Sequence, residues 1–115
     1  MKAHRESDQA LLYSIRCECA IIMGRVQGKL LPDFVNDYNL HDAVVMHLVV
    51  IGETAKQLSS HAKHEFSGLD WSAMARFRDK AVHHYDKIDF LQVWEIVQEH
   101  IPGLYDALSV VEPER

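Results

Sequence analysis

One short segment holds most of the side chains that could do chemistry. It runs from Arg76 to Tyr85 and contains two arginines, a lysine, two histidines and the tyrosine. Arginine and histidine together suffice to cleave RNA without a metal ion. A neutral imidazole can take the proton from a ribose 2'-hydroxyl, and a guanidinium can hold the scissile phosphate while negative charge builds up. Arg78 and His83 are therefore candidates for phosphodiester cleavage, and no cofactor is expected.

Arg78 occupies a helix position where an apolar residue is expected. The steps along its stripe are four, three and four residues, and the other members of the stripe are Trp71, Ala75 and Val82. A guanidinium on a core-facing stripe needs an anion or a dimer cleft to satisfy it. The spacing leaves a second interpretation open, in which Arg78 pairs with Asp79 or Glu53 and the histidines only end a helix.

The elements that position this segment are predicted to be helices. A first amphipathic helix is expected to start near Ser7 or Asp8, both good N-caps, and to end around Gly24 and Gly28. After a connecting segment with one short helical turn, a second helix is expected from about Leu40 to Ser59.

The second helix has Asn39 as its expected N-cap. Its apolar residues form two faces, which predicts a central helix buried on two sides. Gly52 within it would allow a neighbouring helix to approach closely.

Two more helices are expected after a polar linker or short helix at 61–68. Asp70 is suited to cap the helix that carries the Arg76–Tyr85 segment, and Asp89 with Gln92 resembles a capping box for the last helix. Pro102 should kink that last helix or end it early. No strand-like alternation is found, so the chain is expected to be one all-α domain, 1–115, folded as a bundle of four main helices.

Composition limits the kinds of function that fit. The chain has 115 residues and a net charge of -5, which argues against binding nucleic acid over the whole surface. A local basic cluster remains possible, and it comprises Arg76, Arg78, Lys80, His83, His84 and Lys87. The apolar runs are too short to cross a membrane, and no signal peptide is evident. A cytoplasmic protein is expected.

Cysteine and histidine spacing gives no metal centre. Cys17 and Cys19 are two residues apart and would point in nearly opposite directions on a helix, which indicates free, buried thiols. His61 and His64 could share a face, but zinc needs about four ligands and no matching second pair is present.

Several stretches resemble the HepT-like proteins of the HEPN superfamily. Arg78, His83 and Tyr85 match the Arg-X4-His-X-Tyr motif of that family. Residues 51–59 resemble its Ile-Gly-Glu-Ala helix, and residues 69–71 resemble the lead-in to the motif helix, although a proline is missing. Residues 88–102 resemble its Asp-x-x-x-Val-Trp…Leu-Pro ending. Together these stretches span most of the chain from Asp42 onward.

The resemblance implies a HEPN-type, up-and-down helical bundle that acts as a metal-independent endoribonuclease toxin. In this family, two copies of the motif face one cleft, so a homodimer or a higher homo-oligomer is implied. Arg78 and His83 would be the catalytic pair acting on RNA. Asp79 would orient the arginine, and His84 would support the site.

The resemblance also implies a protein partner. Tyr85 matches the residue to which an MntA-like nucleotidyltransferase antitoxin adds AMP, and the added nucleotides would block RNA by bulk and like-charge repulsion. The alternative is a non-catalytic HEPN module that partners or regulates a nucleotidyltransferase. The intact Arg-X4-His pattern favours the enzyme.

Overall fold

The helical signals along the sequence produce an all-α protein. The computed structural model describes residues 7–114, and these contain no strand. Four helices dominate, as expected from the sequence; they are α1 (Asp8–Val26), α3 (Tyr38–Gln57), α5 (Trp71–His83) and α6 (Phe90–Glu99). Shorter helices connect or extend them: α2 (Leu31–Asn36), α4 (Ser60–Glu65), α7 (Ile101–Ala107) and the 3-10 turns Tyr85–Lys87 and Leu108–Val110. The prediction of an all-α bundle is confirmed.

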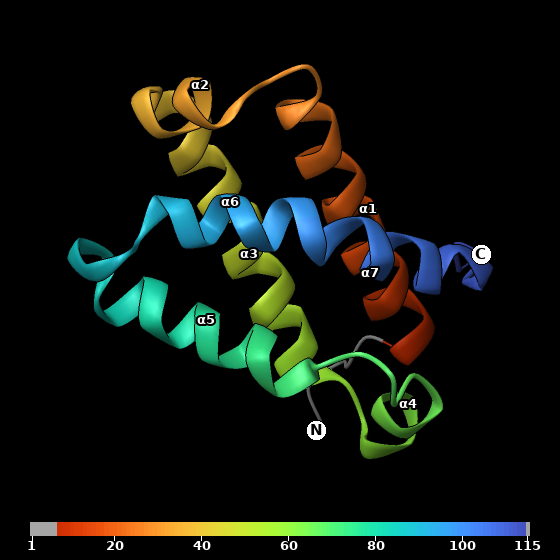
Figure 1. Ribbon diagram of the computed structural model, residues 1–115. Helices are drawn as coiled ribbons and strands as arrows, with labels where there is room; N and C mark the ends of the chain where they lie inside the picture. The colour runs from red at the N-terminus through yellow and green to blue at the C-terminus, as the bar shows by residue number, and fades with distance from the viewer. Residues whose placement is uncertain (1–6, 115) are drawn as a thin grey trace.

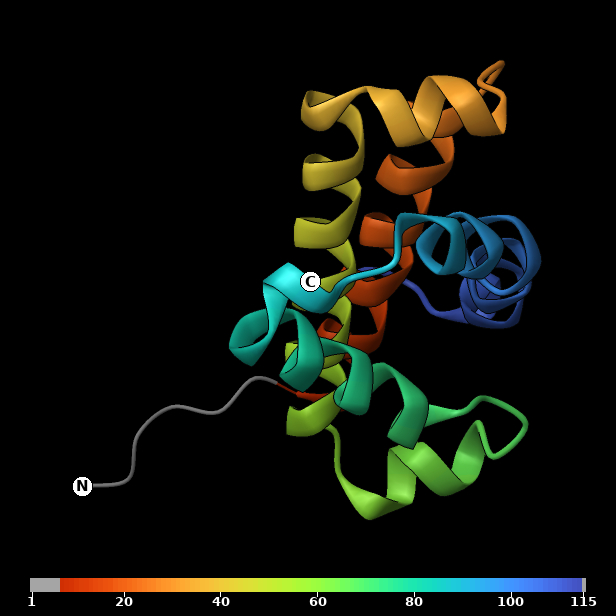
Figure 2. The same cartoon turned by 60° about the vertical axis from the view of Figure 1, so that its left-hand side comes forward.

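Helices α1 and α3 lie side by side and form the centre of the fold (Figures 1 and 2). The side chain of Ser7 caps α1 by accepting from the backbone N–H of Ala10, as expected. The predicted N-cap of α3, Asn39, is wrong. The helix begins at Tyr38, and the carboxylate of Asp37 caps it by accepting from the Leu40 N–H. The chain leaves α2 directly into α3, so the earlier of two suitable cap residues is used.

Helix α5 packs across the second half of α3, and Gly52 lies at the crossing (Figure 2). A Cβ atom added at Gly52 would lie 2.5 Å from the Cβ of Arg78 and 2.5 Å from the backbone oxygen of Met74. The glycine therefore sets how closely the two helices approach, which confirms its expected role. Asp70 caps α5 by accepting from the Ala73 N–H, also as expected.

The last helical segment is broken in two. The carboxylate of Asp89 caps α6 by accepting from the Leu91 N–H. The expected capping box with Gln92 does not form, because Asp89 bonds to the second residue of the helix and not to the third. That helix ends at Glu99, and α7 begins at Ile101 with Pro102 in its first turn, where a missing N–H costs nothing. The predicted interruption by Pro102 is confirmed. Helices α6 and α7 lie across α1 and α3 and cover the core (Figure 1).

The core is apolar and includes side chains from all four main helices, among them Ile15, Ile22, Val44, Ile51, Ala81, Val93 and Val97. Cys17 and Cys19 are both free thiols. Cys19 is fully buried, and burial raises its pKa to about 12, whereas Cys17 is only half-buried, so the prediction of two buried thiols holds for one of them. None of the helices in the part of the chain that the structure describes is long and apolar enough to span a membrane.

Candidate functional site

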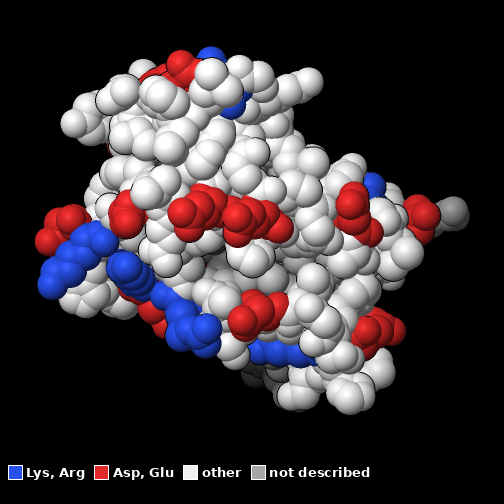
Figure 3. Space-filling model, in the orientation of Figure 1, with Lys and Arg blue, Asp and Glu red and all other residues white. Residues whose placement is uncertain are grey.

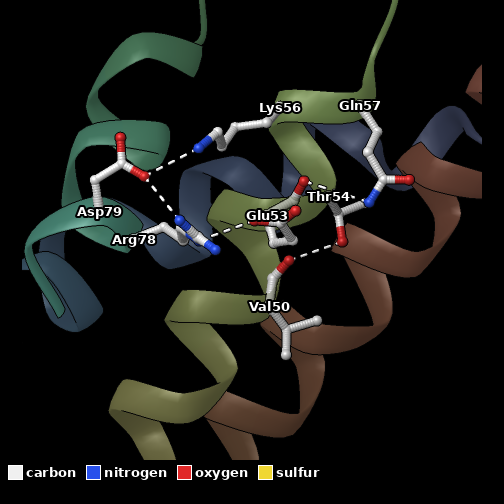
Figure 4. Close-up of polar contacts among 7 residues, drawn as sticks. All are labelled: Val50, Glu53, Thr54, Lys56, Gln57, Arg78 and Asp79. Carbon is white, nitrogen blue, oxygen red and sulfur yellow. Dashed lines mark hydrogen bonds and ion pairs between the residues drawn. The ribbon is translucent and has the colours of Figure 1, made fainter. Parts of the chain in front are cut away.

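Arg78 lies on the side of α5 that faces α3, against Gly52. Its guanidinium is held by two carboxylates: Nε lies 2.8 Å from Oε2 of Glu53 on α3, and Nη1 donates a 3.1 Å hydrogen bond to Oδ1 of Asp79 (Figure 4). The interpretation in which Arg78 pairs with Asp79 and Glu53 is therefore confirmed for the single chain. The charge of the guanidinium on this stripe is therefore compensated within the chain by two acidic residues.

The two ion pairs belong to a larger network. Nζ of Lys56 donates to the same Asp79 oxygen at 3.0 Å, and hydrogen bonds from Lys56 and Arg78 hold the pKa of Asp79 below its usual value. Two cations and two anions thus compensate one another, and they tie the arginine to α3 as well as to α5. Because Asp79 accepts a hydrogen bond from Nη1 of Arg78, it is able to orient the guanidinium.

The guanidinium of Arg78 is held in place, but not all of its nitrogen atoms make hydrogen bonds. Its Nε is buried and makes no hydrogen bond within residues 7–114, because the N–H does not point at the nearby Glu53 carboxylate. Neither contact involves Nη2. The side chain is 24% exposed. A phosphate could therefore bind at Nη2 while Nε and Nη1 stay against the two carboxylates.

His83 and His84 lie at the end of the same helix, and both are exposed. His83 is the last residue of α5, and His84 follows it as the C-cap. Neither imidazole makes a hydrogen bond or an ion pair within the described part of the chain. The nitrogen atoms of each ring are therefore free to exchange a proton with a bound molecule.

Arg78 and His83 do not form a closed site within one chain. Five residues of an α-helix turn through about 140° beyond one full turn, so the two side chains leave α5 in different directions. No hydrogen bond or ion pair joins them among residues 7–114. A substrate has to bridge them, or a second copy of the chain has to complete the arrangement.

Tyr85 is held by a residue that the sequence did not single out. Its hydroxyl donates to Oδ1 of Asp42, near the start of α3. Desolvation, followed by the hydrogen bond and negative charge of Asp42, raises the pKa of Tyr85 to about 12. The same Asp42 oxygen lies 2.8 Å from Nδ1 of His41, which is 2% exposed. The polar residues 41–42 come just before the apolar run 43–46 of α3, but no local spacing relates them to Tyr85.

A shallow apolar groove of about 310 Å³ runs between α3 and α5 beside these residues. Its lining consists of Asp42, Val45, Met46, Val49, Ala81, Val82 and Tyr85. We call it the α3–α5 groove. Met46 and Val82 are 60% and 49% exposed, which is unusual for large apolar side chains on facing helices.

Charge is unevenly distributed over the face shown in Figure 3. Lys and Arg side chains form a stripe over α5 and the turn that follows it, and Asp and Glu side chains form a row along α6 (Figure 3). Arg76, Lys80 and Lys87 are the exposed cations of that segment beside Arg78. The local basic cluster expected from the sequence is therefore present on the surface, within a chain of net charge -5.

The described residues contain no group of three or more His, Cys, Asp or Glu side chains that could hold a metal ion. The chemistry that the site offers comes from an anchored guanidinium, two exposed imidazoles and a hydrogen-bonded phenol. This set suits general acid–base catalysis at a phosphate ester.

An all-α bundle whose motif helix presents these groups defines the HEPN type of protein. The family model described as "Ribonuclease HepT-like" matches residues 15–111. The chain belongs to the HepT-like ribonuclease family.

Named relatives agree with this membership. A "Putative RNase" of Caldanaerobacter subterraneus subsp. tengcongensis is 36% identical over 87 residues, which is 76% of this chain and 78% of the relative. Another "Putative RNase", from Methanocaldococcus jannaschii, is 33% identical over 83% of this chain and 78% of its own length. The "Probable ribonuclease HepT" of Thermococcus cleftensis is 38% identical over 63% of this chain and 66% of its own length. No solved structure matches the chain significantly.

Proposed function

We propose that this protein is a metal-independent endoribonuclease toxin whose catalytic pair is Arg78 and His83. The observation that carries the proposal is the fixed position of Arg78. Contacts to Glu53 and Asp79 orient the guanidinium, while the imidazole of His83, five residues on, is exposed and without a protein partner in the described chain. Attack by the ribose 2'-hydroxyl on its own phosphate requires two protein groups. One is a fixed cation that binds the phosphate, and the other is a base that can accept the hydroxyl proton.

In the proposed reaction, the imidazole of His83 accepts the proton of the ribose 2'-hydroxyl. The 2'-oxygen attacks the adjacent phosphorus, and the bond from phosphorus to the 5'-oxygen breaks. The departing 5'-oxygen takes a proton from water and His83 returns its proton to the solvent, so the products carry a 2',3'-cyclic phosphate and a 5'-hydroxyl. Arg78 stabilises the charge that develops on the phosphoryl oxygens. His84 lies beside His83 and is proposed as a supporting residue.

Cleavage is expected to persist when divalent metal ions are removed. Protein side chains alone supply the base and the charge in this reaction, so EDTA should leave the rate unchanged. The measurement is cleavage of a labelled RNA with and without chelator, with the end groups analysed by mass. Loss of activity in EDTA that zinc or magnesium restores would contradict the mechanism.

The active form is proposed to be a homodimer or a higher homo-oligomer. Arg78 does not need a second copy to compensate its charge, since Glu53 and Asp79 do so within the chain. Two observations support the oligomer: Arg78 and His83 do not face each other within one chain, and the α3–α5 groove exposes Met46 and Val82 next to them. A second copy seated over Met46 and Val82 would bring two motifs to one cleft and leave the end of the groove at Asp42 and Tyr85 uncovered.

Light scattering at micromolar concentration is expected to give at least the mass of a dimer. Val82→Glu should shift the protein to a monomer and lower RNA cleavage, because a charge is placed in the apolar contact. Val110→Glu is the control, since Val110 is a 74% exposed valine outside the groove and its substitution should change neither property. A wild-type monomer that cleaves RNA would contradict the composite cleft.

We further propose that an MntA-like nucleotidyltransferase antitoxin neutralises the toxin by adding AMP to Tyr85. The phenol is 45% exposed and lies two residues after His83, so an adduct would bring negative phosphates to the place where RNA phosphate must bind.

Co-expression with that nucleotidyltransferase should add one or more AMP masses to the intact protein. Tyr85→Phe should remain toxic, gain no mass and resist neutralisation. Tyr105→Phe is the matched control and should behave like wild type. It removes the hydroxyl of a different tyrosine, which lies on α7. Neutralisation of Tyr85→Phe without a mass change would show that the antitoxin masks the cleft instead.

A further inference from the structure

The hydroxyl of Tyr85 is in contact with α3. Asp42 lies 43 residues before Tyr85 in the sequence, and its Oδ1 accepts the hydrogen bond of the phenol. Asp42 itself is 52% exposed, so no requirement of core packing explains its carboxylate at this place. The hydroxyl that the proposed modification uses is therefore already bound to a base.

A buried histidine fixes the direction of that carboxylate. Nδ1 of His41 lies 2.8 Å from Oδ1 of Asp42 and must donate to it, because an ionised carboxylate has no proton to give. The ring of His41 lies against Phe90 with a centroid distance of 3.8 Å, and it makes T-shaped contacts with the rings of Phe34 and Tyr38 at 6.2 and 5.1 Å. These aromatic contacts hold the imidazole in one orientation, and the imidazole in turn holds Asp42 toward Tyr85.

We propose that Asp42, oriented by His41, positions the Tyr85 hydroxyl and accepts its proton during transfer of AMP. This inference rests on the proposed modification of Tyr85. The co-reactant is a nucleoside triphosphate held by the partner enzyme. The phenolic oxygen forms a bond to the α-phosphorus, the bond from that phosphorus to pyrophosphate breaks, and the proton passes to Asp42 and then to water.

The chain thus contributes its own general base to its modification, and the partner need supply only the bound nucleotide and its activation. Asp42, which pairs with His41, faces the phenol from α3, and the titratable neighbours of Tyr85 along the chain are His83, His84, Asp86 and Lys87. Of these, Asp42 alone receives the hydrogen bond of the hydroxyl within the described residues.

The test compares Asp42→Asn with wild type. Asparagine keeps the shape of the side chain and an oxygen that can accept the phenol's hydrogen bond, but it cannot take a proton. The rate at which the partner adds AMP, followed by intact mass, should fall at least ~10²-fold, whereas RNA cleavage by the unmodified protein should stay within ~2-fold of wild type. Asp86→Asn removes the same charge beside Tyr85 and should leave both rates unchanged.

A second measurement needs no Asp42 variant. Ultraviolet titration of wild type against Tyr85→Phe isolates one phenol, which should ionise near 12 if Asp42 holds it. Ionisation at the ordinary value near ~10 would overturn the inference. Equal rates of AMP addition to wild type and Asp42→Asn would also overturn it while leaving the modification of Tyr85 intact. Absence of any mass gain on wild type would overturn both.

Discussion

Arg78→Ala and His83→Ala are each expected to lower the rate of RNA cleavage by at least ~10²-fold, since one removes the group that holds the phosphate and the other removes the base. Overexpression of wild type should slow growth, and neither variant should do so. The measurements are single-turnover cleavage of a labelled RNA and growth after induction. Circular dichroism should show that both variants keep the helical fold.

Two matched controls separate these roles from general effects of charge. Arg76→Ala removes an exposed arginine two residues from Arg78 and should cost much less, because a surface cation contributes only to the overall attraction of RNA. His84→Ala removes the adjacent imidazole and should leave most of the activity. If His84→Ala abolishes cleavage and His83→Ala does not, the base has been assigned one residue too early. Equal toxicity of wild type and both catalytic variants would rule out the ribonuclease assignment.

Gly52→Ala is expected to destabilise the fold and to impair cleavage together. The added methyl would lie 2.5 Å from the Cβ of Arg78 and from the backbone oxygen of Met74, so α5 itself would have to move. Overpacking of this kind costs roughly 1–3 kcal/mol. Because Arg78 moves with α5, its contact to Glu53 on α3 should be lost or weakened, and the rate of cleavage should fall by more than the loss of folded protein explains.

Gly24→Ala provides the matched control for this prediction. Gly24 lies inside α1, and nothing lies within 4 Å of an added Cβ. The substitution should stabilise the helix by up to ~1 kcal/mol and should leave cleavage unchanged. Denaturant unfolding and cleavage rates measured on both variants check the pair. A Gly52→Ala protein as stable and active as Gly24→Ala would contradict the close crossing of α3 and α5.

Much of the fold was predictable because its signals are local. Ser7, Asp70 and Asp89 cap the helices that follow them, and Pro102 ends α6, all as the sequence indicated. Asn39 was a wrong cap prediction because Asp37, two residues earlier, is an equally suitable residue. The choice between them depends on how the chain leaves α2, which is a property of the packed structure.

The candidate site was predictable only in part, for the same reason. The Arg-X4-His-X-Tyr pattern lies within eight residues and is visible in the sequence. Both possible partners of Arg78 could be named, although spacing did not decide whether it pairs with them. The contact of Tyr85 with Asp42 spans 43 residues, and no local spacing reports it. Helix packing creates this contact, so it emerged only from the structure.

The compensated network around Arg78 has a consequence for how RNA would be recognised. An incoming phosphate does not meet a bare cation, because Glu53 and Asp79 already serve as internal counterions to the guanidinium. Binding at this arginine would add a phosphate at Nη2 to a guanidinium whose charge is already compensated. It releases little bound salt, so affinity should depend on ionic strength mainly through the exposed Arg76, Lys80 and Lys87. The attraction that brings RNA to the surface and the group that acts on its phosphate would thus be tuned separately.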